Sequence, residues 1–200
     1  MRVQTRGPAK PRGRQRSLEA ETAILSATSE LLKEKPLREV TTDAIAQRAG
    51  VSKATLYKWW PNKNVVALDA FLSSMKVRVG IPDTGSAFKD FTLHLEDVIQ
   101  FYTTPYGRLL CQFIAEGQSD PEFLTLFRER FLQARRDAVR TIWERGVTRG
   151  ELRDDVESDI GLDLIFGPMV YRLLTGHAPL DKANAEAMVA VAFRGLQKPH

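Results

Sequence analysis

The chain has 200 residues, 43% of them hydrophobic and 27% charged, with a formal net charge of +4. This length and composition can bury a sizeable core in one large domain or two small ones. Its apolar runs fall well short of the roughly 18 residues that a membrane span needs, and no signal-peptide segment follows the basic N-terminus, so we expect a cytoplasmic protein. The single cysteine, Cys111, excludes an internal disulfide framework and a multi-cysteine metal site.

The positive charge lies in the first third of the chain. Up to Asn64 there are 13 Lys and Arg against 6 Asp and Glu, whereas the remainder has 16 against 19. The opening stretch MRVQTRGPAKPRGRQR contains no acid and several Gly and Pro, so residues 1–16 are predicted to form a disordered basic arm. The arm can be a solubilising tail, or it can bind DNA phosphates or a minor groove through Arg14 and Arg16.

Three helices are predicted in the segment that follows the arm. Apolar residues recur at every third or fourth position over residues 18–35. A shorter helix is predicted over residues 42–49 behind a threonine cap, and Gly50 supplies a turn. Ser52 then caps a third helix in which Leu56 points inward. Two short helices around a glycine turn form the helix-turn-helix pattern.

The outward face of the third predicted helix is basic and aromatic. The stretch AGVSKATLYKWWPNK, residues 49–63, contains three lysines, a tyrosine and two tryptophans but no acid. If Leu56 faces the core, the remaining side chains suit a major groove, because they offer phosphate-seeking cations and polar or aromatic edges for the bases. We predict that Trp60 packs in the core, whereas Trp59 can lie in the core or on the surface.

The segment TTDAIAQRAGVSKATLYKWWPNKNVVALDAF, residues 41–71, resembles the DNA-binding segment of the tetracycline-repressor (TetR) family. The shared elements are a second helix, a Gly-Val turn, a recognition helix ending in Leu-Tyr, and an Asn-Lys pair that opens a long fourth helix. Beyond Phe71 the resemblance is mainly architectural. It implies an all-α chain with a helix-turn-helix DNA-binding domain over residues 17–64 and a helical ligand-binding and dimerisation domain over residues 65–200.

The resemblance also implies which residues bind double-stranded DNA. Thr41 and Thr42 begin the second helix, whose N-terminus attracts a phosphate, and Lys63 matches a lysine that binds phosphate from the start of helix four. The recognition-helix positions are occupied by Ser52, Lys53, Ala54, Thr55, Tyr57, Lys58 and Trp59. Two positions depart from the family: Asp43 stands where some relatives place a base-reading arginine, and Trp59 replaces a more often polar residue.

The rest of the chain is predicted to be helical. The predicted helices cover residues 62–79, 86–103, 105–116, 121–146, 156–175 and 181–196. The segment GIPDTG separates the first two, and Pro105 and Pro121 each suit a first helical turn.

Aromatic and apolar residues recur at helical spacing in these helices. Such a stripe is usually core, but the family resemblance implies an inducer pocket among them, and therefore a small apolar or amphipathic effector ligand. The candidate pocket residues are Phe88, Phe91, His94, Leu95, Tyr102, Leu110, Phe113, Ile114, Phe127, Phe131 and Trp143. Gln112 and Gln118 are further candidate polar contacts.

The segment DIGLDLIFGPMVYRLLTGHAPLD, residues 159–181, is apolar over more than one helical face, which is typical of burial on two sides. By resemblance, this helix and the last helix form a homodimer interface; a core helix of a monomer is the alternative. The candidate interface residues are Leu162, Ile165, Phe166, Met169, Leu173, Met188 and Val191. A two-fold dimer would hold its recognition helices roughly 34 Å apart, which predicts a near-palindromic operator.

No catalytic or metal-binding motif stands out. The histidines are scattered, and neither a nucleophile elbow nor a Gly-rich phosphate loop is present. We therefore expect no enzyme activity, no cofactor and no metal, and the resemblance implies a sequence-specific transcriptional regulator, a repressor released from its operator by a small-molecule inducer. Two alternatives remain: a ligand-binding or protein-interaction module that does not read DNA, and a nucleoid-type binder with little sequence preference.

Overall fold

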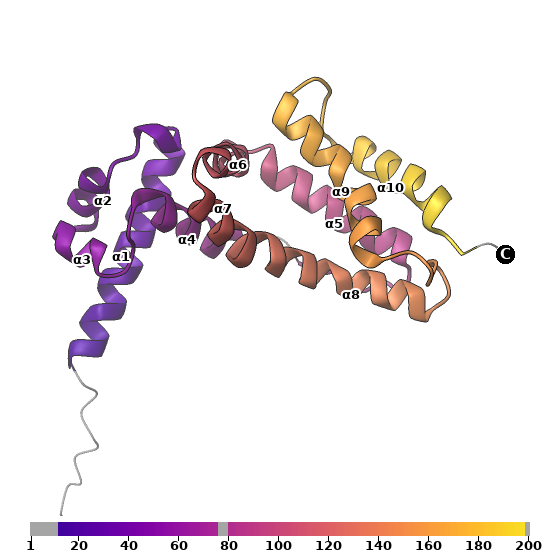
Figure 1. The fold of residues 1–200 in the computed structure, drawn as a ribbon, viewed down its shortest axis with the longest axis horizontal. Coiled ribbons are helices and arrows are strands. Elements are labelled where there is room, and N and C mark those ends of the chain that lie inside the picture. The colour runs from indigo at the N-terminus through magenta and orange to yellow at the C-terminus, as the bar shows by residue number, and fades with distance from the viewer. Residues whose placement is uncertain (1–11, 76–79, 199–200) are drawn as a thin grey trace, which may run out of the picture. The chain divides into compact units, whose positions relative to one another are not determined.

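The computed structural model describes residues 12–75 and 80–198, and helices make up its architecture (Figure 1). Within these ranges no strand forms, and the β-type pairing is an isolated antiparallel bridge between Leu152 and Gln197. The expected all-α fold is thus confirmed. No helix in these ranges is long and apolar enough to cross a membrane.

The chain divides into two compact units, residues 1–70 and residues 71–200. This division falls inside the fourth helix rather than at residue 64, where the sequence analysis placed it. The reason is that the first half of that helix belongs to unit 1: Lys63 Nζ donates to the carbonyl oxygen of Leu37 at 3.0 Å, and Asp69 accepts a hydrogen bond from Trp60.

Unit 1 contains a long first helix followed by the two short helices of the helix-turn-helix. Its elements are α1 (Arg12–Glu34), the 3-10 helix η1 (Leu37–Glu39), α2 (Thr42–Ala49), α3 (Lys53–Tyr57) and the start of α4 (Lys63–Met75). Helix α1 begins at Arg12, so the prediction of disorder up to residue 16 is wrong for residues 12–16. Residues 1–11 of the predicted arm lie outside the described residues.

Local hydrogen bonds set the boundaries of α2 and α3. The hydroxyl of Thr41 accepts from the amide of Ala44 at 3.1 Å, and the hydroxyl of Ser52 accepts from the amide of Thr55 at 3.1 Å. Each cap satisfies an amide that the first helical turn leaves without an intrahelical partner. Between the helices Gly50 has φ of 66°, a left-handed conformation that glycine adopts without steric strain. These caps and this turn confirm the predicted helix-turn-helix.

The core of unit 1 fixes which side of α3 faces outward. Ile24, Ile45 and Leu56 are fully buried, and Trp60 is 4% exposed. The indole nitrogen of Trp60 donates to Asp69 Oδ2 at 2.8 Å, so this buried tryptophan has a partner for its polar atom. The prediction that Trp60 packs in the core is confirmed.

Unit 2 is a helical bundle in which α5 packs against α8, α9 and α10. Its elements are α5 (Ala87–Tyr102), α6 (Leu109–Ser119), α7 (Pro121–Phe127), the π-helix η2 (Arg128–Gln133), α8 (Ala134–Thr148), α9 (Ser158–Thr175) and α10 (Lys182–Leu196). Helix α9 crosses α8 where Gly161 meets Trp143. A Cβ atom at Gly161 would stand 2.2 Å from the indole ring, so this contact requires glycine.

Two helix predictions in unit 2 need correction. Pro105 lies in a turn, and α6 starts later, at Leu109, because Gly107 and Thr104 form a hydrogen-bonded turn before it. The single helix predicted over residues 121–146 is interrupted by the π-helix η2. Pro121 does occupy the first turn of α7, as predicted.

Candidate DNA-binding surface and ligand cavity

The outward face of α3 and the residues just after it carry exposed aromatic and basic side chains. Tyr57 is 49% exposed and Trp59 is 42% exposed, whereas Leu56, just before them, is fully buried. Lys58 places its ammonium nitrogen 5.9 Å from the centroid of the Trp59 ring, a cation–π contact that orients both side chains. Trp59 therefore lies on the surface, which settles the alternative that the sequence left open.

Side-chain contacts join the start of α2 to α3. The hydroxyl groups of Thr42 and Tyr57 lie 3.2 Å apart, and Lys53 forms an ion pair with Asp43. Asp43, which departs from the family pattern, therefore neutralises the charge of Lys53, one of the predicted DNA-contact residues of the recognition helix. Both members of the pair remain more than half exposed, so a competing phosphate can reach Lys53.

Three further predicted contact residues are engaged in local structure. Ser52 caps α3, and its hydroxyl lies 2.9 Å from that of Thr55. Lys63 Nζ donates to the carbonyl oxygens of Leu37 and Arg38, both at 3.0 Å. An ammonium group has three donors, so Lys63 retains one for a phosphate while it holds η1 against the start of α4.

The remaining predicted DNA contacts are Ala54, Thr41, Arg14 and Arg16. Ala54 and Thr41 are exposed. Arg14 and Arg16 lie on the first turns of α1, but their side chains fall outside the described residues.

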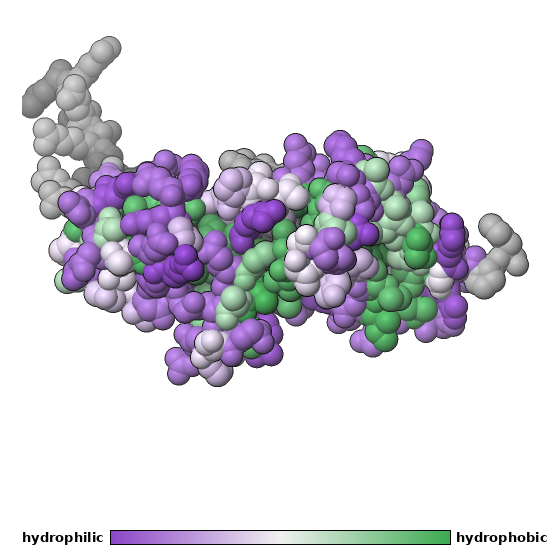
Figure 2. All heavy atoms as spheres, turned by 90° about the horizontal axis from the view of Figure 1, so that it is seen from above, coloured by the Kyte–Doolittle hydropathy of each residue, from purple (hydrophilic) through white to green (hydrophobic). Residues whose placement is uncertain are grey.

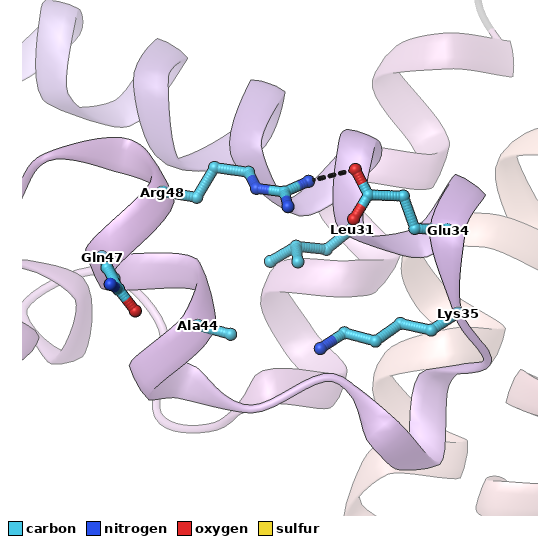
Figure 3. Close-up of a pocket in the computed structure, with 6 residues that line it drawn as sticks. All are labelled: Leu31, Glu34, Lys35, Ala44, Gln47 and Arg48. Atoms are coloured by element: carbon cyan, nitrogen blue, oxygen red, sulfur yellow. Dashed lines mark hydrogen bonds and ion pairs between the residues drawn. The ribbon is translucent and has the colours of Figure 1, made fainter.

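A polar hollow of about 410 Å³ lies between α1 and α2 (Figure 3). Arg48 and Glu34 close one side through an ion pair of 2.5 Å, and Lys35 reaches into the space. The pKa of Glu34 is lowered, chiefly by its hydrogen bond with Arg48. Sequence analysis did not single out this hollow, because the two charges that form the ion pair lie on different helices.

Unit 2 contains a larger cavity of about 620 Å³ that is partly open to the surface. It is bounded by α5, α6, α7, η2, α8 and α9, and most of its wall is apolar. Six predicted pocket residues line it: His94, Tyr102, Leu110, Ile114, Phe127 and Phe131. Of the residues that the sequence analysis did not select for the pocket, the most consequential are Arg128, Arg135, Arg136, Leu132, Val139 and Tyr171.

The other five predicted pocket residues do not line this cavity and pack in the core of unit 2 instead. Phe88 and Phe91 contact the ring of Phe193, with centroid separations of 5.3 and 6.0 Å. Phe113 packs against Phe71 at 5.4 Å. Leu95 is fully buried, and Trp143 packs against Gly161. Gln112 and Gln118 are also absent from the cavity wall.

Burial shifts the pKa values of polar groups in the cavity wall. Burial lowers the pKa of His94 to about 4, although the hydrogen bond of its Nδ1 to the carbonyl oxygen of Gly80, at 2.8 Å, opposes this shift. His94 is therefore neutral at pH 7, and Nε2 is left as an acceptor because Nδ1 carries the proton that the carbonyl binds. Burial raises the pKa of Tyr102 and lowers that of Arg135, so Tyr102 stays a hydroxyl.

Helix α9 has a buried face and an exposed apolar face. The predicted interface residues Leu162, Ile165, Met169 and Leu173 are at most 8% exposed within a single chain, because they pack on the core of unit 2. They are thus not the surface that could meet a partner chain. Phe166 and Met188 are partly buried, and Val191 is 65% exposed.

The exposed apolar side chains around α9 and α10 form a patch that we call the α9–α10 face. It comprises Ile160, Leu164, Tyr171, Leu174 and Val191, each at least 47% exposed. Figure 2 shows hydrophobic residues gathered over the part of unit 2 where these helices lie. Helix α9 alternates between core and exposed apolar positions, as its two-sided sequence pattern predicted. Its exposed side uses residues that were not predicted, whereas Val191 of α10 was predicted and is exposed.

Comparison with known proteins agrees with this architecture. Residues 24–70 match the family model of bacterial regulatory proteins, tetR family, and residues 81–192 match that of the tetracyclin repressor-like C-terminal domain. The uncharacterized HTH-type transcriptional regulator YdeS of Bacillus subtilis is 41% identical over 93% of this chain and 94% of its own.

Two further matches cover both units. The HTH-type transcriptional regulator AqdR of Rhodococcus erythropolis is 31% identical over 76% of this chain and 72% of its own. The crystal structure of the TetR family regulator SCO0332 superposes with a TM-score of 0.79 and 32% identity, covering 88% of this chain and 98% of that one. Together with the capped helix-turn-helix and the helical second unit, these matches show that the chain belongs to the TetR family of helix-turn-helix transcriptional regulators.

Proposed function

We propose that this regulator is a homodimeric repressor that acts in the cytoplasm, binds a near-palindromic operator through α3, and leaves it when a small molecule enters the unit 2 cavity. It carries out no catalytic step. The observation that carries the proposal is the exposed aromatic and basic face of α3, held in place by the Ser52 cap and the buried Leu56. A short rigid helix with such a face suits direct readout in a major groove.

Selection from a random duplex library by the purified full chain tests the DNA-binding part. We expect enrichment of an inverted repeat with half-sites about one helical turn apart, as a two-fold dimer requires. Binding of the enriched duplex should weaken steeply as salt rises, because phosphate contacts release counterions.

Other outcomes of the selection identify the alternatives. Salt-sensitive binding without enrichment means a nucleoid-type binder. No binding at all means a ligand-binding or protein-interaction module whose helix-turn-helix does not read DNA.

Variants separate sequence reading from backbone contact. Trp59→Ala and Thr55→Ala should change the selected sequence, whereas Lys58→Ala should weaken binding to all duplexes and reduce the salt slope. Equal, sequence-independent effects from all three substitutions would contradict direct readout by α3.

The cavity supports the effector part of the proposal. Its volume of about 620 Å³ falls in the range of about 300–1,000 Å³ typical of small-molecule sites, and its wall is mostly apolar with a few polar groups. Helix α4 contributes residues to both units, so a displacement of α4 on ligand binding would move the DNA-reading unit. The ligand acts through its different affinities for the DNA-competent and the released conformations.

The substitution Ile114→Trp, which places a bulky indole in the cavity, tests the effector proposal. We expect it to abolish ligand binding and ligand-induced release while operator binding persists. An inducer that binds Ile114→Trp as tightly as the wild type would place the effector site elsewhere.

The α9–α10 face supports the homodimer. Exposed contiguous apolar residues are typical of protein interfaces, and Leu164 and Val191 are each more than half exposed. We expect Leu164→Glu to yield monomers in sedimentation experiments and to lose operator binding, while Glu186→Lys, an exposed charge change on α10, keeps the dimer. A dimeric Leu164→Glu variant would contradict this assignment.

A further inference from the structure

One arginine of the cavity wall differs from the other arginines of its helix. Arg136, Arg140 and Arg145 of α8 each have a carboxylate oxygen within 2.6, 2.5 and 2.9 Å. Arg135 has no such partner in the part of the chain that the structure describes, and its terminal nitrogen Nη2 is buried without any hydrogen bond. A guanidinium nitrogen that is buried without a hydrogen-bond partner is unfavourable, because it loses hydration and gains no interaction in return.

The position of Arg135 explains how a ligand could supply the missing partner. Its side chain lines the unit 2 cavity, whose wall also includes the apolar side chains of Val98, Leu110 and Phe131. Tyr102 lines the same cavity. The cavity thus has a donor-rich point within an apolar surround, which is the distribution of chemistry in an amphipathic molecule with an anionic group.

The other charged groups of the wall do not compete for this role. Asp163 is paired with Arg136 at 2.6 Å, and Arg136 also binds Asp159. Arg128 is exposed, so water already solvates its charge. His94 is uncharged and offers an acceptor rather than a cation.

We propose that the effector is an amphipathic organic acid whose anionic group pairs with Arg135 inside the unit 2 cavity and whose apolar part contacts the α6, α7 and α9 side of the wall. This inference rests on the proposed effector role of the cavity. Arginine suits the role because its planar fork can bind both oxygens of a carboxylate.

Matched pairs of ligands test the charge requirement on the full chain. The probes are alkyl and naphthyl carboxylates, each paired with the alcohol of the same carbon skeleton, measured by titration calorimetry. We expect the best acid to bind about tenfold or more tightly than its alcohol, because a charged hydrogen bond is stronger than a neutral one. Arg135→Gln should remove this difference and leave alcohol binding within about twofold of the wild type.

Two variants control for folding and for general electrostatics. Arg135→Met removes the unpaired charge and keeps an apolar chain, so the ligand-free protein should melt at the same or a higher temperature while acid binding is lost. Arg128→Gln removes the same charge from an exposed part of the wall and should leave the preference for acids intact. Equal losses of acid binding in Arg128→Gln and Arg135→Gln would overturn the assignment of the anion to Arg135.

The ligand pairs and the Ile114→Trp variant together distinguish a failure of this inference from a failure of the effector proposal. If alcohols and acids bind equally, and Ile114→Trp abolishes both, the cavity is the effector site but the ligand is not selected by charge. If acids bind with the expected preference but Ile114→Trp leaves them unaffected, the acid site lies outside the cavity and both proposals fail. If none of the pairs binds the wild type, an amphipathic acid is not the effector.

Discussion

Lys53 and Lys58 at the α3 surface and Arg135 in the unit 2 cavity carry the same charge in opposite surroundings. The two lysines are exposed, and one of them already shares its charge with Asp43. The guanidinium of Arg135 has a buried nitrogen without a partner. Exposed cations attract any polyanion and are screened by salt, whereas a buried cation selects a partner that fits its site. Under the two proposals, charge contributes to DNA affinity in unit 1 and to ligand selection in unit 2.

The largest effect on stability is expected from Trp143→Ala in unit 2. This side chain is 4% exposed and packs against Gly161, so its removal leaves a void and should lower the free energy of unfolding by about 3–5 kcal/mol. Chemical denaturation measures the change. Trp59→Ala, at a 42% exposed position of unit 1, is the matched control and should change stability little while altering DNA binding. A loss of stability below about 1 kcal/mol for Trp143→Ala would contradict this core role.

Acidification should destabilise unit 2 through His94. The pKa of His94 is about 4 in the folded chain, below its ordinary value of 6.5, because burial disfavours the charged ring. Between these values the unfolded chain binds the proton and the folded chain does not, so stability falls as pH is lowered from 6.5 to 4, by about 3 kcal/mol in total. Denaturation curves across this range check the slope. His94→Gln should flatten it, whereas His177→Gln, at an exposed position, should leave it unchanged.

A smaller effect, confined to unit 1, is expected from Ser52→Ala. The variant removes the hydroxyl that accepts from the Thr55 amide, and loss of such a cap lowers stability by about 1 kcal/mol. Operator affinity should fall further than stability alone explains, because α3 is short and depends on its cap for orientation. Ser52→Asp keeps the acceptor and should retain stability, but it adds a negative charge that opposes DNA. Unchanged operator binding in Ser52→Ala would show that Leu56 alone positions the helix.

The smallest effect on stability is expected from a substitution that changes the charge of the α3 surface. Asp43→Asn removes the acid that pairs with Lys53, and an exposed pair of this kind contributes at most about 1 kcal/mol to stability. We expect folding to be nearly unchanged, nonspecific DNA affinity to rise several-fold, and the salt slope to steepen by about one unit. Filter binding over a salt series measures both. Glu39→Gln, an exposed charge change within η1, serves as the control.

Unit 1 was predictable because its determinants are close in sequence. Thr41, Gly50 and Ser52 act within three residues of the amides and turns that they control. The first helix was the exception, since its start at Arg12 could not be inferred from a stretch rich in Gly, Pro and Arg.

The cavity of unit 2 was predictable only in outline. Helical spacing identified apolar residues, but the choice between core and cavity depends on partners far away in sequence, as with Phe91 and Phe193. The segment QARRD, residues 133–137, does not show which of its two arginines pairs with a carboxylate, because Asp159 and Asp163 reach Arg136 from another helix. The exposed residues of α9 were not predicted because both sides of this helix are apolar, so the sequence does not show which side packs on the core.

The π-helix η2 sets the rotational phase between α7 and α8. Its hydrogen bonds span one residue more than those of an α-helix, so the turn accommodates extra chain without breaking the helical path. Successive α-helical residues differ by about 100° in direction, so deletion of one residue within 128–133 would turn the α7 side chains relative to those of α8. Phe127 would then no longer share a wall with Arg135. Under the proposed effector role of the cavity, a single insertion or deletion at this turn would change which ligand fits without altering the DNA-reading helix α3.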